Sequence, residues 1–244
     1  MLKIKNLKKY FGGVRAVDGA SFNVSEGKIT ALIGPNGSGK TTIFNLISGI
    51  LKADFGSIGF EGEDLTKLFV YRISNLGISR LFQQTRLFDN LSVRDNLLLA
   101  LNNENMKFWK NLINYKYSSD DLDKVKEIAK LVGIESFMNK LARDLSYGQK
   151  RLVEIGRAIV KPHKLLMLDE PVAGVNPKLR DDISKLLVKL RDDGETILLI
   201  EHDMNFTLGI SDHVVVMDEG KVISEGSPRK VKNDKKVLEA YLGE

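Results

Sequence analysis

The chain contains no cysteine. This absence excludes disulfide bonds, thiolate nucleophiles and thiolate metal sites together. Long apolar runs are also missing, because no stretch approaches the roughly 20 residues that a helix needs to span a bilayer. The first residues, in which lysines are interleaved with apolar side chains, lack the apolar segment of a signal peptide. We therefore expect a cytoplasmic chain.

Charge of one sign does not gather in long blocks. The 37 lysines and arginines are mixed with 32 aspartates and glutamates, and the net charge of +5 suits nucleic acid, an anionic membrane surface or phosphate ligands equally. Internal repeats and low-complexity tracts are absent as well. With 43% hydrophobic residues among 244, the chain is of ordinary globular composition and forms one large or two small domains.

One motif carries clear chemistry. Residues 34–41 read G-x-x-x-x-G-K-T, directly after the apolar run 29–33. The glycines let successive backbone N–H groups point inward, and the N-terminus of a following helix adds positive potential, which suits phosphate groups. Lys40 offers a charge to the β and γ phosphates, and Thr41 offers a hydroxyl to Mg²⁺. The sequence predicts a nucleoside triphosphate site in Gly34, Pro35, Asn36, Gly37, Ser38, Gly39, Lys40, Thr41 and Thr42.

Apolar patterns indicate strands at both ends of the chain and helices between them. Alternating or continuous apolar runs predict strands over 2–4, 20–24, 29–33, 165–168 and 196–200, and a hairpin over 214–223. Helical spacing predicts helices over 42–50, 97–100, 122–132, 152–160 and 179–190. Residues 102–119 read most like a loop. The middle of the chain is therefore expected to be mainly helical.

Two carboxylates, Asp169 and Glu170, follow the apolar run 165–168. Acidic residues can end any strand, but active sites of open α/β sheets lie beyond the carboxyl ends of strands. Asp169 is therefore a candidate for holding Mg²⁺ beside the phosphate loop, and Glu170 a candidate for polarising water. The separation between Lys40 and Asp169 far exceeds the dozen or so residues that a simple crossover needs. We infer an insertion, and the helical middle is the candidate.

The insertion contains the segment Leu145-Ser146-Tyr147-Gly148-Gln149. Ser146 offers a hydroxyl, Gly148 lets a phosphate approach the backbone, and a helix that starts near Gln149 would present N–H groups to an anion. Ser-x-Gly is also a common helix-entry sequence, and taken alone it favours a capping role.

In their order along the chain, the phosphate loop, residues 145–149, Asp169-Glu170 and the later His202 resemble an ABC ATPase. The resemblance covers nearly the whole chain. It implies the α/β class, with a P-loop NTPase core that is RecA-like and has a mixed sheet with N-terminal antiparallel strands. It further implies a single ABC domain over 1–244, with an inserted α-helical subdomain over approximately 92–161.

The same resemblance assigns roles to individual residues. Phe11 would stack on adenine, although by itself it is typical of a core residue. Gln83 would link Mg²⁺ to the transporter interface, although by itself it is typical of a solvated polar residue. The implied catalytic residues are Glu170, His202 and Lys40, and the implied Mg²⁺ residues are Thr41, Gln83 and Asp169. Ser146, Tyr147, Gly148 and Gln149 would face the ATP of a second subunit in a head-to-tail dimer.

Two residues depart from the family pattern: Tyr147 stands in place of glycine, and Asn176 in place of aspartate. Together with residues 83–88, 200–203 and 102–119, they resemble the ATP-binding subunit of branched-chain amino-acid importers. That resemblance implies integral membrane permease subunits, a second ABC ATPase subunit with a heterodimer favoured, and an extracytoplasmic substrate-binding protein contacted indirectly. It places the chain on the cytoplasmic face of the cell membrane.

Two alternatives remain from the sequence. An ABC-type lipid or lipopolysaccharide export ATPase shares most of these motifs and differs in the transported molecule. A soluble nucleic-acid or translation ATPase usually carries tandem nucleotide domains, coiled-coil arms or zinc modules, which this sequence lacks, so we expect no nucleic-acid partner.

Overall fold

The computed structural model describes residues 1–82, 87–101 and 117–242, which form two compact units. The first unit comprises Met1–Arg80, Lys164–Glu170 and Leu187–Glu244. The second comprises Leu81–His163 and Pro171–Leu186.

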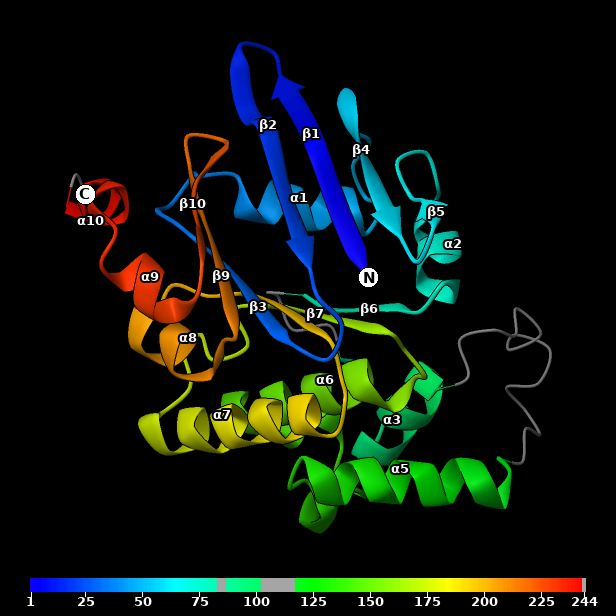
Figure 1. Cartoon of the computed structure of the whole chain (residues 1–244). Helices are drawn as coiled ribbons and strands as arrows, with labels where there is room; N and C mark the ends of the chain where they lie inside the picture. Colours follow the sequence, from blue (N-terminus) through cyan, green and yellow to red (C-terminus); the bar gives the residue numbers. More distant parts are fainter. Residues whose placement is uncertain (83–86, 102–116, 243–244) are drawn as a thin grey trace. The chain divides into compact units, whose positions relative to one another are not determined.

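An antiparallel sheet opens the first unit (Figure 1). Its strands are β1 (Leu2–Phe11), β2 (Val14–Val24), β4 (Phe55–Phe60) and β5 (Glu63–Asp64), in the order β2-β1-β4-β5. Apolar residues of β1 and β2 alternate between buried and less buried positions, because successive side chains of a strand point to opposite faces. β1 and β2 form a hairpin whose turn follows Phe11.

The second sheet of this unit is mixed. Its order is β10-β9-β3-β8-β7-β6, with β3 (Ile29–Ile33), β6 (Ile78–Leu81), β7 (Leu165–Asp169), β8 (Ile197–Ile200), β9 (His213–Asp218) and β10 (Lys221–Gly226). The pairs β9-β3, β3-β8 and β8-β7 are parallel, so these strands end at one edge of the sheet. β8 lies between β3 and β7, so the strand of Asp169 is not the direct neighbour of the phosphate-loop strand.

Helices cover both faces of the mixed sheet. α1 (Lys40–Ile47) shares one buried cluster with side chains of both sheets, including Phe44 of α1, Leu32 of β3 and Ile4 of β1. On the opposite face, Ile33 and Val216 pack in a second cluster with the helices α8 (Met204–Ile210), α9 (Pro228–Lys232) and α10 (Lys235–Leu242). Burial on both faces explains why the central strands read as continuous apolar runs.

α1 ends at Ile47, earlier than the predicted helix over 42–50. The hydroxyl of Ser48 donates to the carbonyl of Phe44 at 2.7 Å, and Gly49 follows with a positive φ of 73°. A left-handed residue after the last turn ends a helix. Ile50 is consequently 46% exposed instead of lying on the buried face of the helix.

The second unit is helical. It contains α3 (Val93–Leu101), α5 (Ser119–Leu131), η1 (Glu135–Phe137), η2 (Ala142–Asp144), α6 (Tyr147–Val160) and the first turns of α7 (Pro177–Asp192). α3, α5 and α6 pack on one another and bury apolar residues such as Leu97, Val125 and Val153. α5 begins at Ser119, within the stretch 102–119 that reads as a loop, because Ser118 and Asp121 form a capping box there.

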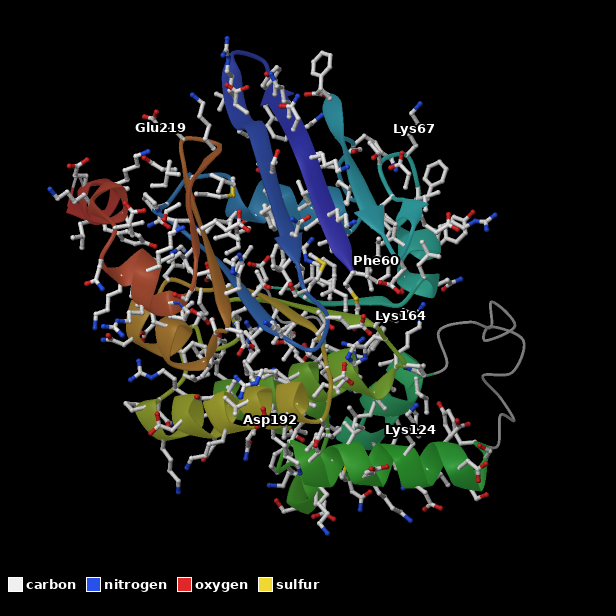
Figure 2. All side chains as sticks on the ribbon, in the orientation of Figure 1. Phe60, Lys67, Lys124, Lys164, Asp192 and Glu219 are labelled. Atoms are coloured by element: carbon white, nitrogen blue, oxygen red, sulfur yellow. The ribbon has the colours of Figure 1, made fainter. Side chains whose placement is uncertain are left out.

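Several elements were not predicted from the sequence. Among them are the short α2 (Val70–Asn75) and the C-terminal helices α8, α9 and α10. The predicted hairpin over 214–223 is present as β9 and β10. Figure 2 shows Glu219 at its tip, where this residue takes a positive φ of 43°. Within the described residues, every helix falls short of the length and hydropathy that crossing a bilayer demands.

Candidate functional site

The loop after β3 curls tightly because its glycines adopt backbone angles that other residues rarely reach. Gly34, Gly37 and Gly39 have positive φ values of 149°, 79° and 102°. A Cβ on Gly34 would lie 2.0 Å from the carbonyl oxygen of Met217, and one on Gly39 would lie 2.3 Å from that of Ala16. Glycine is therefore required at both positions for the loop to pack against β2 and β9.

The outer side of this loop is open. Asn36 and Gly37 are exposed, whereas Pro35 and Ser38 are buried. A Cβ built on Gly37 would meet no heavy atom within 4 Å. α1 begins directly after the loop, and its N-cap is Gly39, which has no side chain to accept from the first helical N–H groups. This arrangement fits a chain of phosphates, which accepts hydrogen bonds from loop and helix N–H groups.

Lys40 lies inside the loop and is 5% exposed. Its Nζ donates to the carbonyl oxygens of Gly34 and Pro35, both at 2.8 Å, and to Oγ of Ser38 at 3.3 Å. The ammonium charge is thus held at the centre of the curl. Thr41, the next residue of α1, is exposed.

The two predicted carboxylates at the end of β7 have different surroundings. Asp169 is 2% exposed, and the side chain of Glu170 is 14% exposed. Glu170 has a positive φ of 51°, which is uncommon for a residue with a side chain. Its N–H donates to the carbonyl of Ile200 at 2.9 Å, so the pairing with β8 continues one residue past Asp169. Strained backbone of this kind clusters at active sites.

His202 joins this group from the end of β8. Its Nε2 lies 2.7 Å from Oε1 of Glu170, and its side chain is 42% exposed. The turn that carries it is held on both sides. The carboxylate of Glu201 accepts from the N–H of His202 at 3.2 Å, and Asp203 caps α8 by accepting from the N–H of Phe206 at 2.9 Å. The structure therefore brings together two residues predicted to be catalytic.

Phe11 lies at the end of β1 and is 46% exposed. Nζ of Lys9 is 5.5 Å from the centroid of its ring, within the range of a cation–π contact. Lys9 also donates to Asp54 at 2.8 Å, and the N–H of Tyr10 donates to the same carboxylate at 2.7 Å. These bonds, that of Lys9 first, hold the pKa of Asp54 below its ordinary value. An exposed ring with a cation fixed beside it is suited to stack on a purine base.

Ser146 is the N-cap of α6. Its Oγ accepts from the N–H of Gln149 at 3.3 Å, and the Gln149 side chain accepts from the N–H of Ser146 at 3.0 Å. This capping box starts the helix at Tyr147, which corrects the predicted start near Gln149. Ser146 therefore has, in this structure, the capping role that the sequence favours for Ser-x-Gly taken alone.

Both departures from the family pattern have local structural roles in the second unit. The hydroxyl of Tyr147 donates to the carbonyl of Ala173 at 3.2 Å. Asn176 caps α7 by accepting from the N–H of Leu179 at 2.9 Å. A Cβ on Gly148 would lie 2.6 Å from a methyl group of Leu179, so glycine permits this close approach of α6 to α7.

A buried arginine, Arg151, occupies the next turn of α6 and is 1% exposed. Its Nε donates to the carbonyl of Pro171 at 3.1 Å, and its Nη1 donates to the carbonyl of Phe82 at 3.2 Å and to Glu154 at 3.2 Å. Pro171 directly follows Glu170, and Phe82 directly precedes Gln83. α6 therefore holds Pro171 and Phe82, each of which is adjacent in sequence to a predicted site residue.

The structure places the predicted site residues in different units. The phosphate loop, Phe11, Asp169, Glu170 and His202 belong to the first, and the signature residues 146–149 belong to the second. Gln83 lies outside the described residues. Sequence reasoning missed Arg80 and Arg151, whose side chains are both buried, because polar residues precede each of them and no local pattern sets them apart from exposed arginines.

Comparisons with known proteins show what the whole chain is similar to. A family model described as ABC transporter matches residues 17–173, and one described as Branched-chain amino acid ATP-binding cassette transporter matches residues 221–244. The chain is 38% identical over 250 residues to the high-affinity branched-chain amino acid transport ATP-binding protein BraF of Pseudomonas aeruginosa, covering 100% of this chain and 98% of that protein.

Solved structures of ATP-binding cassettes are similar to this chain along all or nearly all of its length. The ADP conformation of MJ1267, an ATP-binding cassette of an ABC transporter, has a TM-score of 0.88 and 37% identity, covering 100% of this chain and 99% of that one. The dimeric post-hydrolysis state of the cassette MJ0796, bound to ADP and Pi, has a TM-score of 0.79 and 26% identity, with coverages of 94% and 99%. These likenesses confirm the α/β P-loop NTPase class expected from the sequence.

Proposed function

The chain belongs to the ABC transporter family of ATP-hydrolysing subunits, and we propose that it powers the import of branched-chain amino acids. The observation that carries this proposal is the likeness to a branched-chain amino acid transport protein along the whole chain. The match of residues 221–244 to a second branched-chain transporter model supports it. We further infer one ABC domain, in which the helical stretch over approximately 92–161 is an inserted subdomain.

Nucleotide binding is assigned to the first unit. Lys40, held among the carbonyls of its loop, supplies positive charge to the β and γ phosphates, while backbone N–H groups within residues 36–42 donate to phosphate oxygens. Phe11, exposed and backed by Lys9, stacks on adenine. The loop and the ring together bind the two ends of ATP.

The donor set also fits Mg²⁺. Thr41 offers an exposed hydroxyl and Asp169 a buried carboxylate, and hard oxygen ligands are those that Mg²⁺ prefers. Gln83 is the third residue assigned to the ion, from the sequence alone. When held by these residues together with the nucleotide, Mg²⁺ would supply positive charge to the β and γ phosphates.

Glu170 and His202 are assigned to hydrolysis. Glu170 orients the attacking water and accepts its proton. The contact of 2.7 Å with Nε2 of His202 holds the carboxylate in one orientation. A neutral imidazole can donate one hydrogen bond without ionising, which leaves Glu170 as the base. Lys40 stabilises the charge that develops on the transferred phosphoryl group.

We assign Ser146, Tyr147, Gly148 and Gln149 to the ATP of a second ABC subunit, in a head-to-tail dimer for which a heterodimer is favoured. The capping role of Ser146 is compatible with this assignment. Its oxygen accepts from the N–H of Gln149, and the hydroxyl proton can still be donated to a phosphate. The dimeric state of the similar cassette MJ0796 supports the pairing of two such subunits.

The remaining partners follow from the transport role. The chain would lie peripherally on the cytoplasmic face of the cell membrane, bound to integral permease subunits. An extracytoplasmic substrate-binding protein would deliver the amino acid and would be reached through the permease. Closing and opening of the ATPase pair would be the movement that is transmitted to the permease subunits.

Uptake in cells tests the function directly. Deletion of this gene should reduce the uptake of labelled leucine, isoleucine and valine, and the wild-type chain should restore it. Glu170→Gln should bind ATP and fail to restore uptake, whereas Lys67→Ala, an exposed control, should restore it fully. Unchanged amino-acid uptake in the deletion strain, together with a lipid-export defect, would favour the export alternative. ATPase activity stimulated by DNA or RNA would favour the nucleic-acid alternative.

The partners are tested by capture of the tagged chain from native membranes. We expect integral permease subunits and a second, different ABC ATPase in the captured complex. Two copies of this chain with permease subunits would overturn the heterodimer. Capture of the chain with no integral protein would contradict the transport role.

A further inference from the structure

Arg80, on β6, forms a buried ion pair with the predicted Mg²⁺ carboxylate. Its side chain is 6% exposed, and that of Asp169 is 2% exposed. Nη2 of Arg80 donates to Oδ2 of Asp169 at 3.0 Å. Both residues belong to the first unit, where β6 and β7 are neighbours in the mixed sheet.

The other end of the same guanidinium holds α1. Nη1 donates to Oδ1 of Asn45 at 2.8 Å and to Oγ of Ser48 at 2.7 Å. Asn45 lies in the last turns of α1, and Ser48 is its C-cap. One planar group therefore connects the carboxylate of β7 with the helix that begins at Lys40 and Thr41.

The guanidinium has little freedom to move. Its central carbon lies 5.5 Å from the ring centroid of Phe44, which is fully buried. The hydroxyl of Ser48 donates to the carbonyl of Phe44 at 2.7 Å, which leaves its oxygen to accept from Arg80. Asp169 is thus paired with a group that is itself fixed by its surroundings.

Stability alone does not explain this pair. Removing two charges from water costs about as much as their attraction returns, and apolar pairs of similar volume are often equally stable. Under the proposed function, however, Asp169 binds Mg²⁺. Carboxylates that bind metals are commonly oriented by a neighbour that donates hydrogen bonds to them.

We propose that Arg80 is a positioning residue that orients Asp169 for Mg²⁺, an inference that rests on the proposed function. Because Oδ2 is bound to Nη2, the carboxylate is held in one rotamer before the ion arrives. Through Asn45 and Ser48, Arg80 ties that rotamer to α1, which carries Thr41. The arginine therefore sets the relative placement of two oxygen ligands that come from β7 and from α1.

Positioning and charge predict opposite effects of removing Arg80. A cation close to the site repels Mg²⁺, so loss of its charge alone would strengthen metal binding. Loss of an orienting neighbour instead weakens metal binding by about 10- to 100-fold. The direction of the change therefore separates the two roles.

The test compares Arg80→Gln with Arg80→Lys, because lysine keeps the charge but loses the planar fork. Mn²⁺ serves as the probe, and free Mn²⁺ is measured by electron paramagnetic resonance with a saturating non-hydrolysable ATP analogue. We expect Mn²⁺ to bind at least about 10-fold more weakly to Arg80→Gln and at least about 3-fold more weakly to Arg80→Lys. Affinity for the analogue in EDTA should be unchanged. Arg72→Gln, an exposed control on α2, should alter neither quantity.

Asp169→Asn distinguishes failure of this inference from failure of the proposed function. If Asp169→Asn weakens Mn²⁺ binding but neither Arg80 variant does, positioning by Arg80 is overturned and the metal assignment stands. Weaker Mn²⁺ binding in Arg80→Gln with wild-type binding in Arg80→Lys also overturns it, because the planar fork would then not be needed to orient Asp169. Stronger Mn²⁺ binding in Arg80→Gln overturns it too, because the charge of Arg80 would then act only by repulsion. If Asp169→Asn has no effect, the metal assignment fails and the inference fails with it. Thermal unfolding checks each variant, and Arg80→Lys decides alone if Arg80→Gln does not fold.

Discussion

Nε2 of His202 lies 2.7 Å from Oε1 of Glu170, although the two residues follow different strands. β7 and β8 are parallel, and Asp169 pairs with Ile200 in their register. The residues that follow this pair therefore leave the sheet at the same edge. The left-handed backbone of Glu170 then directs its carboxylate toward the imidazole.

This contact predicts strongly non-additive kinetics. Glu170→Gln and His202→Ala should each lower the rate of ATP hydrolysis by about 10²- to 10⁴-fold, as expected for loss of a proton-transfer group or of the residue that orients it. The double variant should be little slower than the more impaired single variant, because residues that act as a unit are not additive. Single-turnover hydrolysis measures all three. Additive losses in the double variant would show that the two residues act independently.

Phe11→Ala should weaken ATP binding by about 5- to 150-fold, since stacking of a base on an aromatic ring contributes about 1–3 kcal/mol. Binding of inorganic triphosphate, which has no base, should not change. Val14→Ala is the matched control, because Val14 faces Phe11 across the hairpin and is 66% exposed. Equal weakening of ATP and triphosphate binding would mean that Phe11 supports the hairpin and does not contact the base.

Substitution of Ser146 separates its two assigned roles. Ser146→Ala should lower the free energy of unfolding by about 1 kcal/mol, because α6 loses its N-cap. Ser146→Asn keeps a capping side chain and should be nearly as stable as the wild type. Both should lose the ATP-dependent dimer, measured by light scattering in a Glu170→Gln background together with the partner ATPase. A normal dimer with Ser146→Asn would restrict the serine hydroxyl to capping.

Arg151→Met should lower the free energy of unfolding by about 3–5 kcal/mol, because it removes the buried ion pair with Glu154 together with the hydrogen bonds to the carbonyls of Pro171 and Phe82. Adding Glu154→Leu should recover much of that loss, since an apolar pair can replace a buried ion pair. Urea denaturation measures both values. Lys150→Met, which breaks the more exposed pair with Asp89, should cost at most about 1 kcal/mol. A double variant no more stable than Arg151→Met would indicate that the bonds to Pro171 and Phe82 dominate.

The lowered pKa of Asp54 predicts that the difference in Tm between Asp54→Asn and the wild type depends on pH. Its pKa is lowered from 3.8, first by the hydrogen bond from Lys9 and then by that from Tyr10 N–H, so the native state favours the charged form. Its contribution to stability is complete above the unfolded pKa and is lost as the pH falls through the lower native pKa. Asp54→Asn should therefore lower Tm at neutral pH, and the gap from the wild type should narrow below pH 3.8. Asp193→Asn, an exposed control, should show little difference at either pH.

The sequence predicts best those elements whose pattern has one physical explanation. The runs 29–33 and 165–168 are almost entirely apolar because their strands are buried on both faces, and both strands are present. The ends of helices were less predictable. α5 starts among polar residues because Ser118 and Asp121 cap it, and α1 stops early because Ser48 bonds to its last turn.

In the candidate site, too, some features are predictable from local sequence and others are not. The phosphate loop is contiguous, so its composition alone indicates its chemistry. The contact of Glu170 with His202 depends on strand order and register, which no local pattern contains. Arg80 and Arg151 could not be assigned from the sequence, because only the folded chain shows which acceptors surround a buried charge.

The bonds from Lys40 to Gly34, Pro35 and Ser38 have a consequence for how tightly a nucleotide can bind. When a phosphate binds, the ammonium of Lys40 exchanges hydrogen bonds to loop oxygens for hydrogen bonds to phosphate oxygens. The binding free energy therefore contains only the difference between these two sets of bonds. A neutral residue at this position removes the charge and also the hydrogen bonds that hold the loop in its curled conformation. Replacement of Lys40 should thus lower the stability of the protein without nucleotide as well as its affinity for ATP.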